Sequence, residues 1–384
     1  MSEAVRSAAE AAAPDRRTRL RASRFGRRAW WVAAWIVLLA LPFYLNSFWL
    51  QTGLFAMAAI IPAIGLTLLV GTTGQLSLGH AFFVAIGAYG YSFLAGHSEQ
   101  IGVSVSTKGA GLPPLVAMIG AVALAGLAGA LFSPIAGRLR GIYLGIASLG
   151  LVFLGQHILF NASDVTGGFN GRDSEVFSLF GFHFDDTSPS LTLFGVALGQ
   201  LERLWYLGLA LVGIAYWYAR NLVRSRPGRG LQSVRDSEVA AAVMGVDVPR
   251  YKAAAFTISS MYAGLGGVLF ALAIQRVVPN SFDFTLSIDF LAMIVLGGLG
   301  SIGGALLGAI FVTILPQLFE HYSGSLPLVS SGGGGLEPSE AARFLYGAAV
   351  VAVLMFAPGG LAGLARRVRL RRPRSSGPSP APTT

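Results

Sequence analysis

The chain has 384 residues, no cysteine, a net charge of +10, 54% hydrophobic residues and only 12% charged residues. Soluble domains carry about 25% charged residues, so the fraction of charged residues in this chain is about half the usual one. The composition excludes a soluble globular protein, a disordered chain and a disulfide scaffold. It predicts an all-α fold, that of a polytopic helical membrane protein.

Apolar runs predict about ten transmembrane helices, since a helix needs about 20 apolar residues to cross a bilayer. We expect the spans at 30–46, 51–71, 79–96, 113–133, 141–160, 204–219, 252–276, 286–299, 302–319 and 343–360. The glycine-rich stretch 297–304 leaves two alternatives open. It is a tight turn between two spans, or it interrupts one broken helix across 286–319.

The basic residues predict the orientation. Loops on the cytoplasmic side of a membrane are enriched in Lys and Arg. With ten spans and a cytoplasmic N-terminus, 23 of the 28 Lys and Arg residues fall inside and five fall outside. Both termini are therefore expected to be cytoplasmic. The same distribution accounts for the net positive charge of the chain, so no nucleic-acid partner is expected.

The transmembrane permease domain is expected at 29–361, with two loops of its own outside the bilayer and one segment flanking it at each end. The Arg-rich stretch 1–28 and the Pro/Ser-rich tail 362–384 are predicted to be disordered and cytoplasmic. The stretch 161–203 is the longest external loop, with Asp, Ser, Gly and Pro turn residues. The stretch 220–251 is the long cytoplasmic loop.

No catalytic, cofactor or metal site is predicted. Five scattered histidines without cysteine give no metal-ligand spacing, and neither lysine follows a glycine as a phosphate-binding loop requires. If ATP drives this protein, a partner must bind the nucleotide. Ionisable residues are scarce within the spans, His157 and Asp289 being the exceptions, which disfavours transport through a proton relay of the chain's own. For His157, both a structural and a path-lining role stay open.

The cytoplasmic loop predicts a helix of about four turns over 231–244. An apolar stripe would comprise Leu231, Val234, Ala241 and Met244, opposite Arg235, Asp236 and Glu238. Gly245 is expected to end this helix. Asp247 is expected to cap the next one, which re-enters the membrane. The pattern is typical of a stiff lever, although an inert surface helix is the alternative.

Two clusters of small and polar residues join spans. The first, 71–80, lies on the inside and contains Gln75, Ser77 and His80. It predicts a reverse turn or unwound backbone along a path shielded from lipid. The second lies outside after the fifth span and contains Thr166, Gly167, Gly168 and Asn170. Its Gly and Asn residues predict turns with positive φ.

In this order, the segments resemble the larger, M-type permease subunits of bacterial branched-chain amino acid ABC importers. The similar stretches are GTTGQLSLGHAFFVAIGAY (71–89), RGIYLGIASL (140–149), VTGGFNG (165–171), GRGLQSVRDSEVAAAVMGVDVPRYKAAAFTISSMYAGLGGVLFA (228–271) and LAMIVLGGLGSIGGALLGA (291–309). The long cytoplasmic stretch is the most specific of them. The resemblance covers about residues 50–360.

The resemblance implies a multi-pass permease of the bacterial plasma (inner) membrane that works by alternating access. Its partners would be a second, similar permease, two cytoplasmic ATP-binding subunits and an external solute-binding protein, with the bilayer around it. Whether it pairs with a different permease or with itself stays open. ATP hydrolysis would belong to the partners, so the chain is expected to be a transport subunit and not an enzyme.

The resemblance also implies roles for the segments. The stretch 238–245 is similar to the loop that docks on the ATPase, although Val239 departs from the Glu-Ala-Ala order of many importers. We expect coupling through Arg235, Asp236, Glu238, Ala241 and Gly245, a translocation path at Gln75, Ser77 and His80, and docking of the binding protein on 161–203. The solute stays open among branched-chain and other amino acids, urea and short amides. A self-contained channel or secondary transporter and a structural membrane subunit are the competing classes.

Overall fold

The computed structural model describes residues 35–101, 105–139, 141–179, 182–184, 192–193, 196–197, 199–322, 338–357 and 359–363. The predictions for 1–28 and for the tail beyond residue 363 lie outside these ranges. The chain divides into two compact units, 1–50 and 51–384, which we treat separately. In the first unit, residues 35–40 are helical and continue into the 3-10 helix η1 (Leu41–Phe43).

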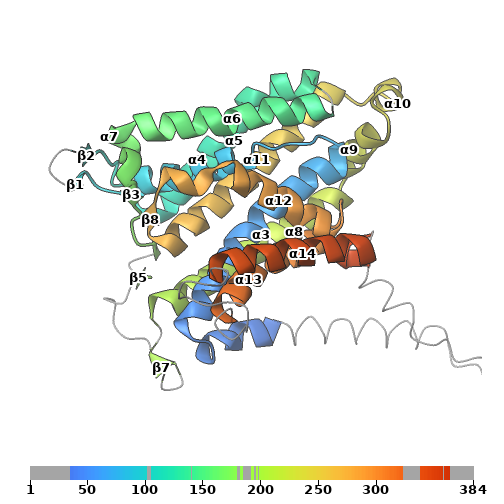
Figure 1. The fold of residues 1–384 in the computed structure, drawn as a ribbon. Helices are drawn as coiled ribbons and strands as arrows, with labels where there is room; N and C mark the ends of the chain where they lie inside the picture. The colour runs from blue at the N-terminus through green and yellow to red at the C-terminus, as the bar shows by residue number, and fades with distance from the viewer. Residues whose placement is uncertain are drawn as a thin grey trace, which may run out of the picture. The chain divides into compact units, whose positions relative to one another are not determined.

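The second unit is built almost entirely from helices, and helix α3 (Ser47–Thr73) leads into it (Figure 1). The other long helices are α4 (His80–Ala95), α5 (Pro114–Arg138), α6 (Ile142–Asn161), α8 (Gln200–Arg224), α9 (Arg226–Asp236), α11 (Val248–Ile274), α12 (Phe284–Gly297), α13 (Ile302–Tyr322) and α14 (Pro338–Phe356). The short helices are α7 (Ser163–Thr166), η2 (Gly168–Asn170), α10 (Glu238–Val243) and η3 (Pro279–Phe282). Each span predicted from 51–71 onward therefore corresponds to one helix.

Five of the described helices are long and apolar enough to cross a membrane: α3, α5, α6, α11 and α13. Helices α4 and α12 and residues 344–356 of α14 are apolar but shorter. The charge-free stretch of α8 is bounded by Arg203 and Arg220 and is rich in Tyr and Trp. The all-α polytopic membrane class is confirmed.

The stretch 286–319 forms two helices joined by a tight turn. Gly298 and Gly300 adopt φ angles of 105° and 79°, which other residues rarely reach. Beyond the turn, a Cβ at Gly308 would lie 1.9 Å from the carbonyl oxygen of Met293. Helices α12 and α13 thus pack backbone to backbone as a hairpin, and the alternative of one broken helix is wrong.

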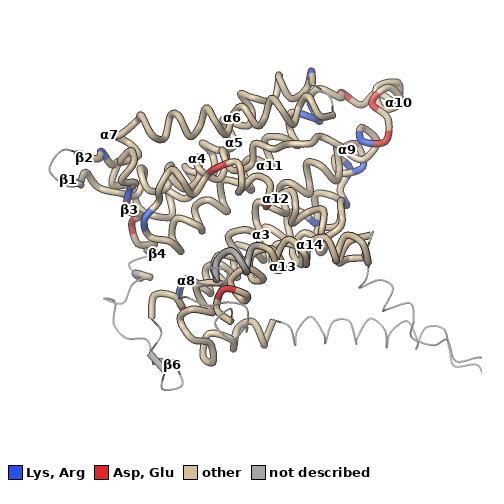
Figure 2. The backbone as a smooth tube through the Cα atoms, in the orientation of Figure 1, with Lys and Arg blue, Asp and Glu red and all other residues tan. Residues whose placement is uncertain are grey.

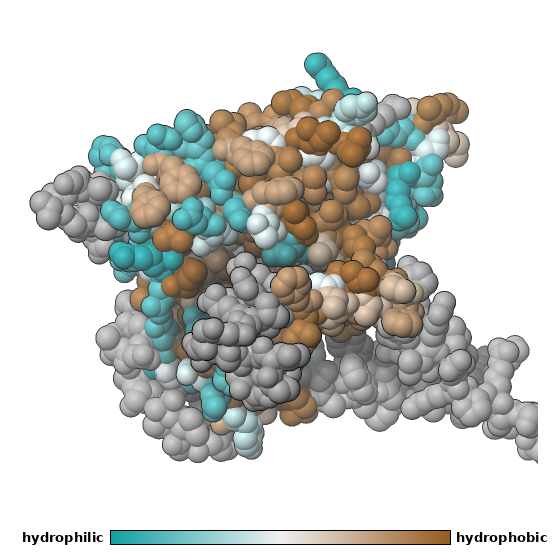
Figure 3. Space-filling model, viewed as in Figure 1, coloured by the Kyte–Doolittle hydropathy of each residue, from teal (hydrophilic) through white to brown (hydrophobic). Residues whose placement is uncertain are grey.

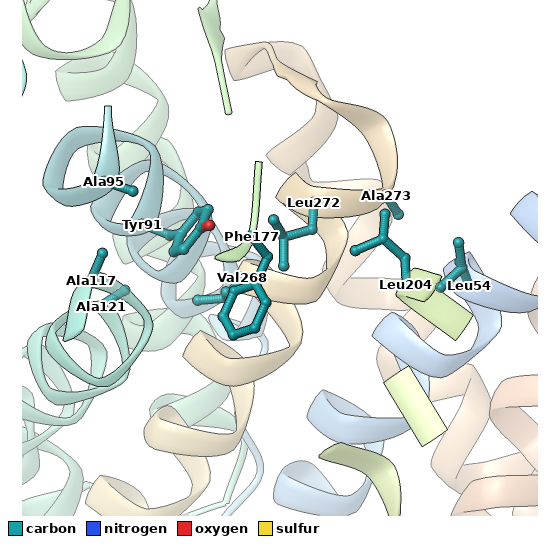
Figure 4. Packing of buried hydrophobic residues seen from close by; sticks show 10 residues of the cluster. All are labelled: Leu54, Tyr91, Ala95, Ala117, Ala121, Phe177, Leu204, Val268, Leu272 and Ala273. Carbon is teal, nitrogen blue, oxygen red and sulfur yellow. The ribbon is translucent and has the colours of Figure 1, made fainter. Parts of the chain in front are cut away.

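The core lies where α4 and α5 pack against α11. At one crossing, a Cβ on Gly87 would lie 2.0 Å from the carbonyl oxygen of Gly264, so only glycine permits this approach. Toward one end, side chains from five helices and the segment after β3 pack together (Figure 4). The buried cluster consists of Leu54, Tyr91, Ala95, Ala117, Ala121, Phe177, Leu204, Val268, Leu272 and Ala273.

The described residues also form short antiparallel strand pairs, which the sequence did not predict. They are β1 (Glu99–Ile101) with β2 (Val105–Thr107), β3 (Arg172–Asp173) with β8 (Arg276–Val277), β4 (Ser178–Leu179) with β5 (Phe182–His183), and β6 (Thr192–Leu193) with β7 (Val196–Ala197). The β3–β8 pair is reinforced by Arg276, whose guanidinium donates to both carboxylate oxygens of Asp173 at 2.7 and 3.1 Å. The strands thus organise part of the predicted external loop.

Charged residues of the described chain gather at two ends of the helix bundle, with few between them (Figure 2). In the space-filling view, hydrophobic residues form the broad middle and hydrophilic residues gather toward the ends (Figure 3). Several contacts between connecting segments of the described chain join stretches that the ten-span alternation assigns to one side. Examples are Gly71 with Gly300, Gln75 with Ala136, Lys108 with Asp164, and Gln200 with Gln275. The alternation of sides therefore agrees with the packing.

Candidate coupling loop and translocation segment

The predicted continuous helix over 231–244 is wrong, because the chain forms two helices there, α9 and α10. Ser237 separates them with extended backbone (φ −161°, ψ 115°), and its hydroxyl accepts a hydrogen bond from the Ala240 N–H at 3.2 Å. Capping by serine starts a new helix at this point. The other predicted boundaries are confirmed: Gly245 ends α10 with a φ of +83°, and the Asp247 carboxylate caps α11 by accepting from the Arg250 N–H.

Helix α9 is fixed to the end of α3 by Arg235. Its Nη1 donates to the carbonyl oxygen of Gly71, in the last turn of α3, at 2.8 Å. A Cβ on Gly300, in the α12–α13 turn, would lie 3.6 Å from the same nitrogen. Gly71 and Gly300 themselves touch, since a Cβ on Gly71 would lie 2.5 Å from the Cα of Gly300. Three segments far apart in sequence therefore meet at one guanidinium.

Helix α10 is fixed to α11 by an ion pair between Glu238 and Lys252. The Lys252 Nζ lies 2.5 Å from Glu238 Oε1, and the lysine side chain is only 3% exposed whereas the glutamate side chain is 26% exposed. An ammonium group this deeply buried needs its partner, because an unpaired buried charge is costly. Sequence reasoning missed Lys252, since a lysine at the start of a span is expected to extend toward water.

The outward face of α10 is apolar. Val239, Val243 and Met244 are 72%, 82% and 83% exposed, whereas Ala241 is buried. Figure 3 shows hydrophobic residues gathered over α10. The predicted stripe thus holds for Leu231, Val234 and Ala241 but is wrong for Met244, because the break at Ser237 rotates it outward. Asp236 and Gly245 are exposed as well.

The segment between α3 and α4 is unwound from Gly74 to Gly79, as one of the two alternatives predicted. Gln75 and Ser77 are buried within it, at 4% and 0% exposure. The Gln75 side-chain amide donates to the carbonyl oxygen of Ala136 at 3.3 Å. The Ser148 hydroxyl of α6 accepts from the Leu78 N–H at 2.9 Å. The Ser148 hydroxyl thus replaces a backbone hydrogen bond that a helix would have made internally.

His80 opens α4 and is buried at 1% exposure. Its Nε2 lies 3.0 Å from the Ser259 hydroxyl oxygen, and that hydroxyl donates to the carbonyl oxygen of Gly65 at 2.7 Å. Because the hydroxyl has one proton, Nε2 must be the donor in this chain of bonds. His80 Nδ1 then has a free lone pair, and it has no hydrogen-bond partner among the described residues.

The external cluster after α6 forms a tight turn. Gly167 and Gly168 have φ angles of +75° and +58°, as predicted, whereas Asn170 lies in η2 without positive φ. The buried Thr166 hydroxyl donates to the carbonyl oxygen of Leu159 at 2.6 Å and accepts from the Gly168 N–H. A Cβ on Gly167 would lie 1.9 Å from the carbonyl oxygen of Gly171, so the turn admits only glycine there.

The buried Arg172, which sequence reasoning missed, holds this turn to the rest of the outer end. Its guanidinium donates to the carbonyl oxygens of Lys108 at 2.5 Å and Val165 at 2.9 Å, and it lies over the Phe93 ring. Beside it, a cavity of about 610 Å³ opens between the 173–177 segment, the start of α8 and the end of α11. The turn is therefore held in place by buried contacts.

Within the described residues, no group of three or more His, Asp or Glu residues is placed to hold a metal ion. His157 is exposed on α6 and lies 3.4 Å from the side-chain nitrogen of Asn161. Contacts thus join the path candidate His80 and the coupling candidate Glu238 to one helix, α11. The coupling candidate Arg235 contacts the end of α3, which leads into the segment with Gln75 and Ser77.

Comparisons with known proteins agree with this arrangement. The family model described as "Branched-chain amino acid transport system / permease component" matches residues 48–354. The high-affinity branched-chain amino acid transport system permease protein LivM of Escherichia coli is 31% identical over 345 residues, covering 87% of this chain and 75% of LivM. The LivH permease of the same organism is 26% identical over 271 residues (68% of this chain, 81% of LivH). The E. coli ribose import permease protein RbsC is 27% identical over 265 residues (66% and 72%).

Proposed function

Since the chain belongs to the family of branched-chain amino acid transport system permease components, we propose that this multi-pass membrane protein is the translocating subunit of an ATP-driven importer. The observation that carries the proposal is the apolar, exposed tip of α10, formed by Val239, Val243 and Met244, on a helix anchored from behind. Exposed apolar patches at the end of a rigid element mark protein docking sites. The proposed occupant is a cytoplasmic ATP-binding subunit.

The anchors support a lever mechanism. When ATP closes the partner subunits, they displace α10, and the Glu238–Lys252 pair transmits that displacement to α11. Arg235 transmits it to Gly71, which directly precedes the unwound segment with Gln75 and Ser77. Rigid-body motion of packed elements is a common way to switch between two states. In this mechanism Arg235, Glu238 and Ala241 hold the lever, and the α10 tip contacts the partner.

The proposed translocation path includes Gln75, Ser77 and His80. These side chains supply amide, hydroxyl and imidazole groups along unwound backbone, without a fixed charge. Such groups suit a polar solute that must bind weakly and leave again. ATP-driven closure would alternately expose them to the two sides, and a solute affects the two states only through its different affinity for each.

Partners are proposed from the relatives. LivM and LivH of E. coli both bear the name of one high-affinity branched-chain amino acid system. We therefore propose a second, homologous permease, two ATP-binding subunits and a solute-binding protein that docks outside, on the rigid turn around Thr166, Gly167 and Gly168. The second permease is either a different chain or another copy of this one. The location is the plasma (inner) membrane of a bacterium, with both termini in the cytoplasm.

Branched-chain amino acids are the proposed solute, because LivM is more similar to this chain than RbsC, whose name specifies ribose import. The same importer carrying urea or short amides is the alternative. A self-contained channel or secondary transporter is the second alternative. That function would give the exposed tip of α10 no role.

The test changes the tip and not its anchors. V243D/M244D replaces two side chains that are more than 80% exposed, so the fold should be retained while the ATP-binding subunit no longer co-purifies. F169D is the matched control, because Phe169 is 77% exposed at the opposite end, and it should retain the ATP-binding subunit. A helix break in α10, A241P, should abolish ATP hydrolysis stimulated by the solute-binding protein and its solute. Wild-type co-purification in V243D/M244D, together with wild-type stimulation in A241P, would overturn the proposal.

A further inference from the structure

The inner end of α8 carries a cluster of arginines that the proposed coupling mechanism does not use. Arg220 and Arg224 lie in the last turns of α8, and Arg226 and Arg229 lie in the first turns of α9. All four side chains are exposed. None of them forms an ion pair with a residue in the described part of the chain. Between Glu202 and Asp236 the sequence has no acidic residue at all.

The arginines continue a lipid-facing stripe of α8. Ile214 and Trp217 are 62% and 66% exposed, as expected for side chains that meet acyl chains and the interface. Arg220 and Arg224 follow Trp217 by three and seven residues, a spacing that places all three on one helix face. Arg220 and Arg224 therefore lie on the same exposed face of α8 as Trp217.

Trp217 fixes the depth of this stripe. Trp and Tyr side chains are enriched at membrane interfaces, where the ring lies at headgroup level. At about 1.5 Å of rise per residue, Arg220 and Arg224 extend about 4 and 10 Å beyond Trp217 along the helix. The headgroup layer is about 5–7 Å thick on each side of the hydrocarbon core, so Arg220 lies within it and the long side chain of Arg224 can reach back to it. Tyr218, 48% exposed, adds a second interfacial ring beside Trp217.

From this juxtaposition we propose that the α8–α9 corner, comprising Trp217, Arg220, Arg224, Arg226 and Arg229, binds the phosphate headgroup of an anionic phospholipid. Guanidinium groups bind phosphate in a bidentate manner. Clusters of four or more basic residues directly beside a membrane helix attract anionic lipids. The site rests on the proposed cytoplasmic placement of this end but is independent of which solute is carried.

A lipid bound at this corner would contact the start of α9, where the coupling loop begins. The Ser225 hydroxyl accepts from the Gly228 N–H and fixes the α8–α9 corner, and α9 continues to Arg235, the contact with Gly71. A negatively charged headgroup would reduce the repulsion among the four guanidinium groups at this corner. The lipid would therefore stabilise the resting position of the proposed lever.

The test uses tryptophan quenching in nanodiscs that contain brominated phosphatidylglycerol or brominated phosphatidylcholine. The Trp217 contribution is obtained by subtracting the W217F signal. In wild type, we expect the anionic lipid to be preferred at Trp217 by at least about tenfold. R220Q/R224Q/R226Q/R229Q should reduce this preference to none, and the charge-conserving variant with four lysines should retain part of it, because lysine keeps the charge but not the bidentate geometry.

Removing four arginines from the tail (R366Q/R367Q/R369Q/R371Q) is the matched control for net charge and should leave the preference at Trp217 unchanged. The proposal is overturned if wild type shows equal quenching by the two lipids, or if the tail variant loses the preference as fully as the α8–α9 variant. It is also overturned if the intact complex with its partner subunits shields Trp217 from both lipids, since a protein partner would then cover the corner. A failed proposed function would instead appear as absent partner subunits with lipid preference intact.

Discussion

Removing Glu238 should destabilise α10 more than removing Lys252, its partner in the ion pair. Removing one member of a buried ion pair costs about 3–5 kcal/mol, because the other charge stays buried without a partner. The two sides of this pair differ, since Lys252 is 3% exposed and Glu238 is 26% exposed. E238A strands the buried ammonium group and should destabilise α10 by about 3 kcal/mol. K252M strands a carboxylate that water reaches and should cost about 1 kcal/mol.

Hydrogen exchange at the α10 amides measures these local free energies. A difference of about 1.4 kcal/mol corresponds to tenfold, so E238A should accelerate exchange by up to about 100-fold and K252M by about fivefold. The double variant E238A/K252M removes both charges and should exchange more slowly than E238A alone. R250A is the matched control, because the Arg250–Asp247 pair is 87% and 48% exposed and such pairs contribute at most about 1 kcal/mol. Equal exchange in E238A and K252M, or no rescue in the double variant, would refute the reasoning.

Three further predictions concern the path and the outer turn. Q75L/S77L should abolish solute uptake while the complex still assembles, which transport into proteoliposomes measures; retained uptake would remove these residues from the path. S259A deletes the acceptor for His80 Nε2 and the donor to Gly65, and should lower stability by about 1–3 kcal/mol in thermal unfolding, whereas S233A on α9 should have little effect. Deleting residues 167–171 should weaken binding of the solute-binding protein in surface-plasmon measurements without loss of the ATP-binding subunit; unaltered affinity would contradict a docking role for the turn.

The spans were predictable because a bilayer imposes length and polarity on every segment that crosses it. From the sequence, the α12–α13 turn was one of two alternatives, the other being one broken helix. The glycines at 297–304 did not decide between them, because glycine permits both close packing and positive φ. Packing decided between them: Gly308 approaches Met293 as only an antiparallel hairpin allows. The charges at the two ends followed from the same distribution of arginines that the sequence displays.

The details of the coupling loop could not be predicted. Ser237 lacks the Glu or Gln three residues later that completes a capping box, so the apolar periodicity favoured one uninterrupted helix and placed Met244 on the wrong face. The hydrogen bonds of the unwound segment join residues far apart in sequence, such as Gln75 with Ala136 and His80 with Ser259. Contacts of this kind depend on the tertiary packing of several helices, which no local pattern specifies.

The central claim is that this chain works as one subunit of an ATP-driven importer. Mass spectrometry of what co-purifies with the tagged full chain from its host in mild detergent tests it most directly. The account predicts a second permease and an ATP-binding subunit with a phosphate-binding loop, in near-stoichiometric amounts. A chain recovered alone, or only as a homo-oligomer, across several detergents would contradict it and favour a self-contained channel or secondary transporter.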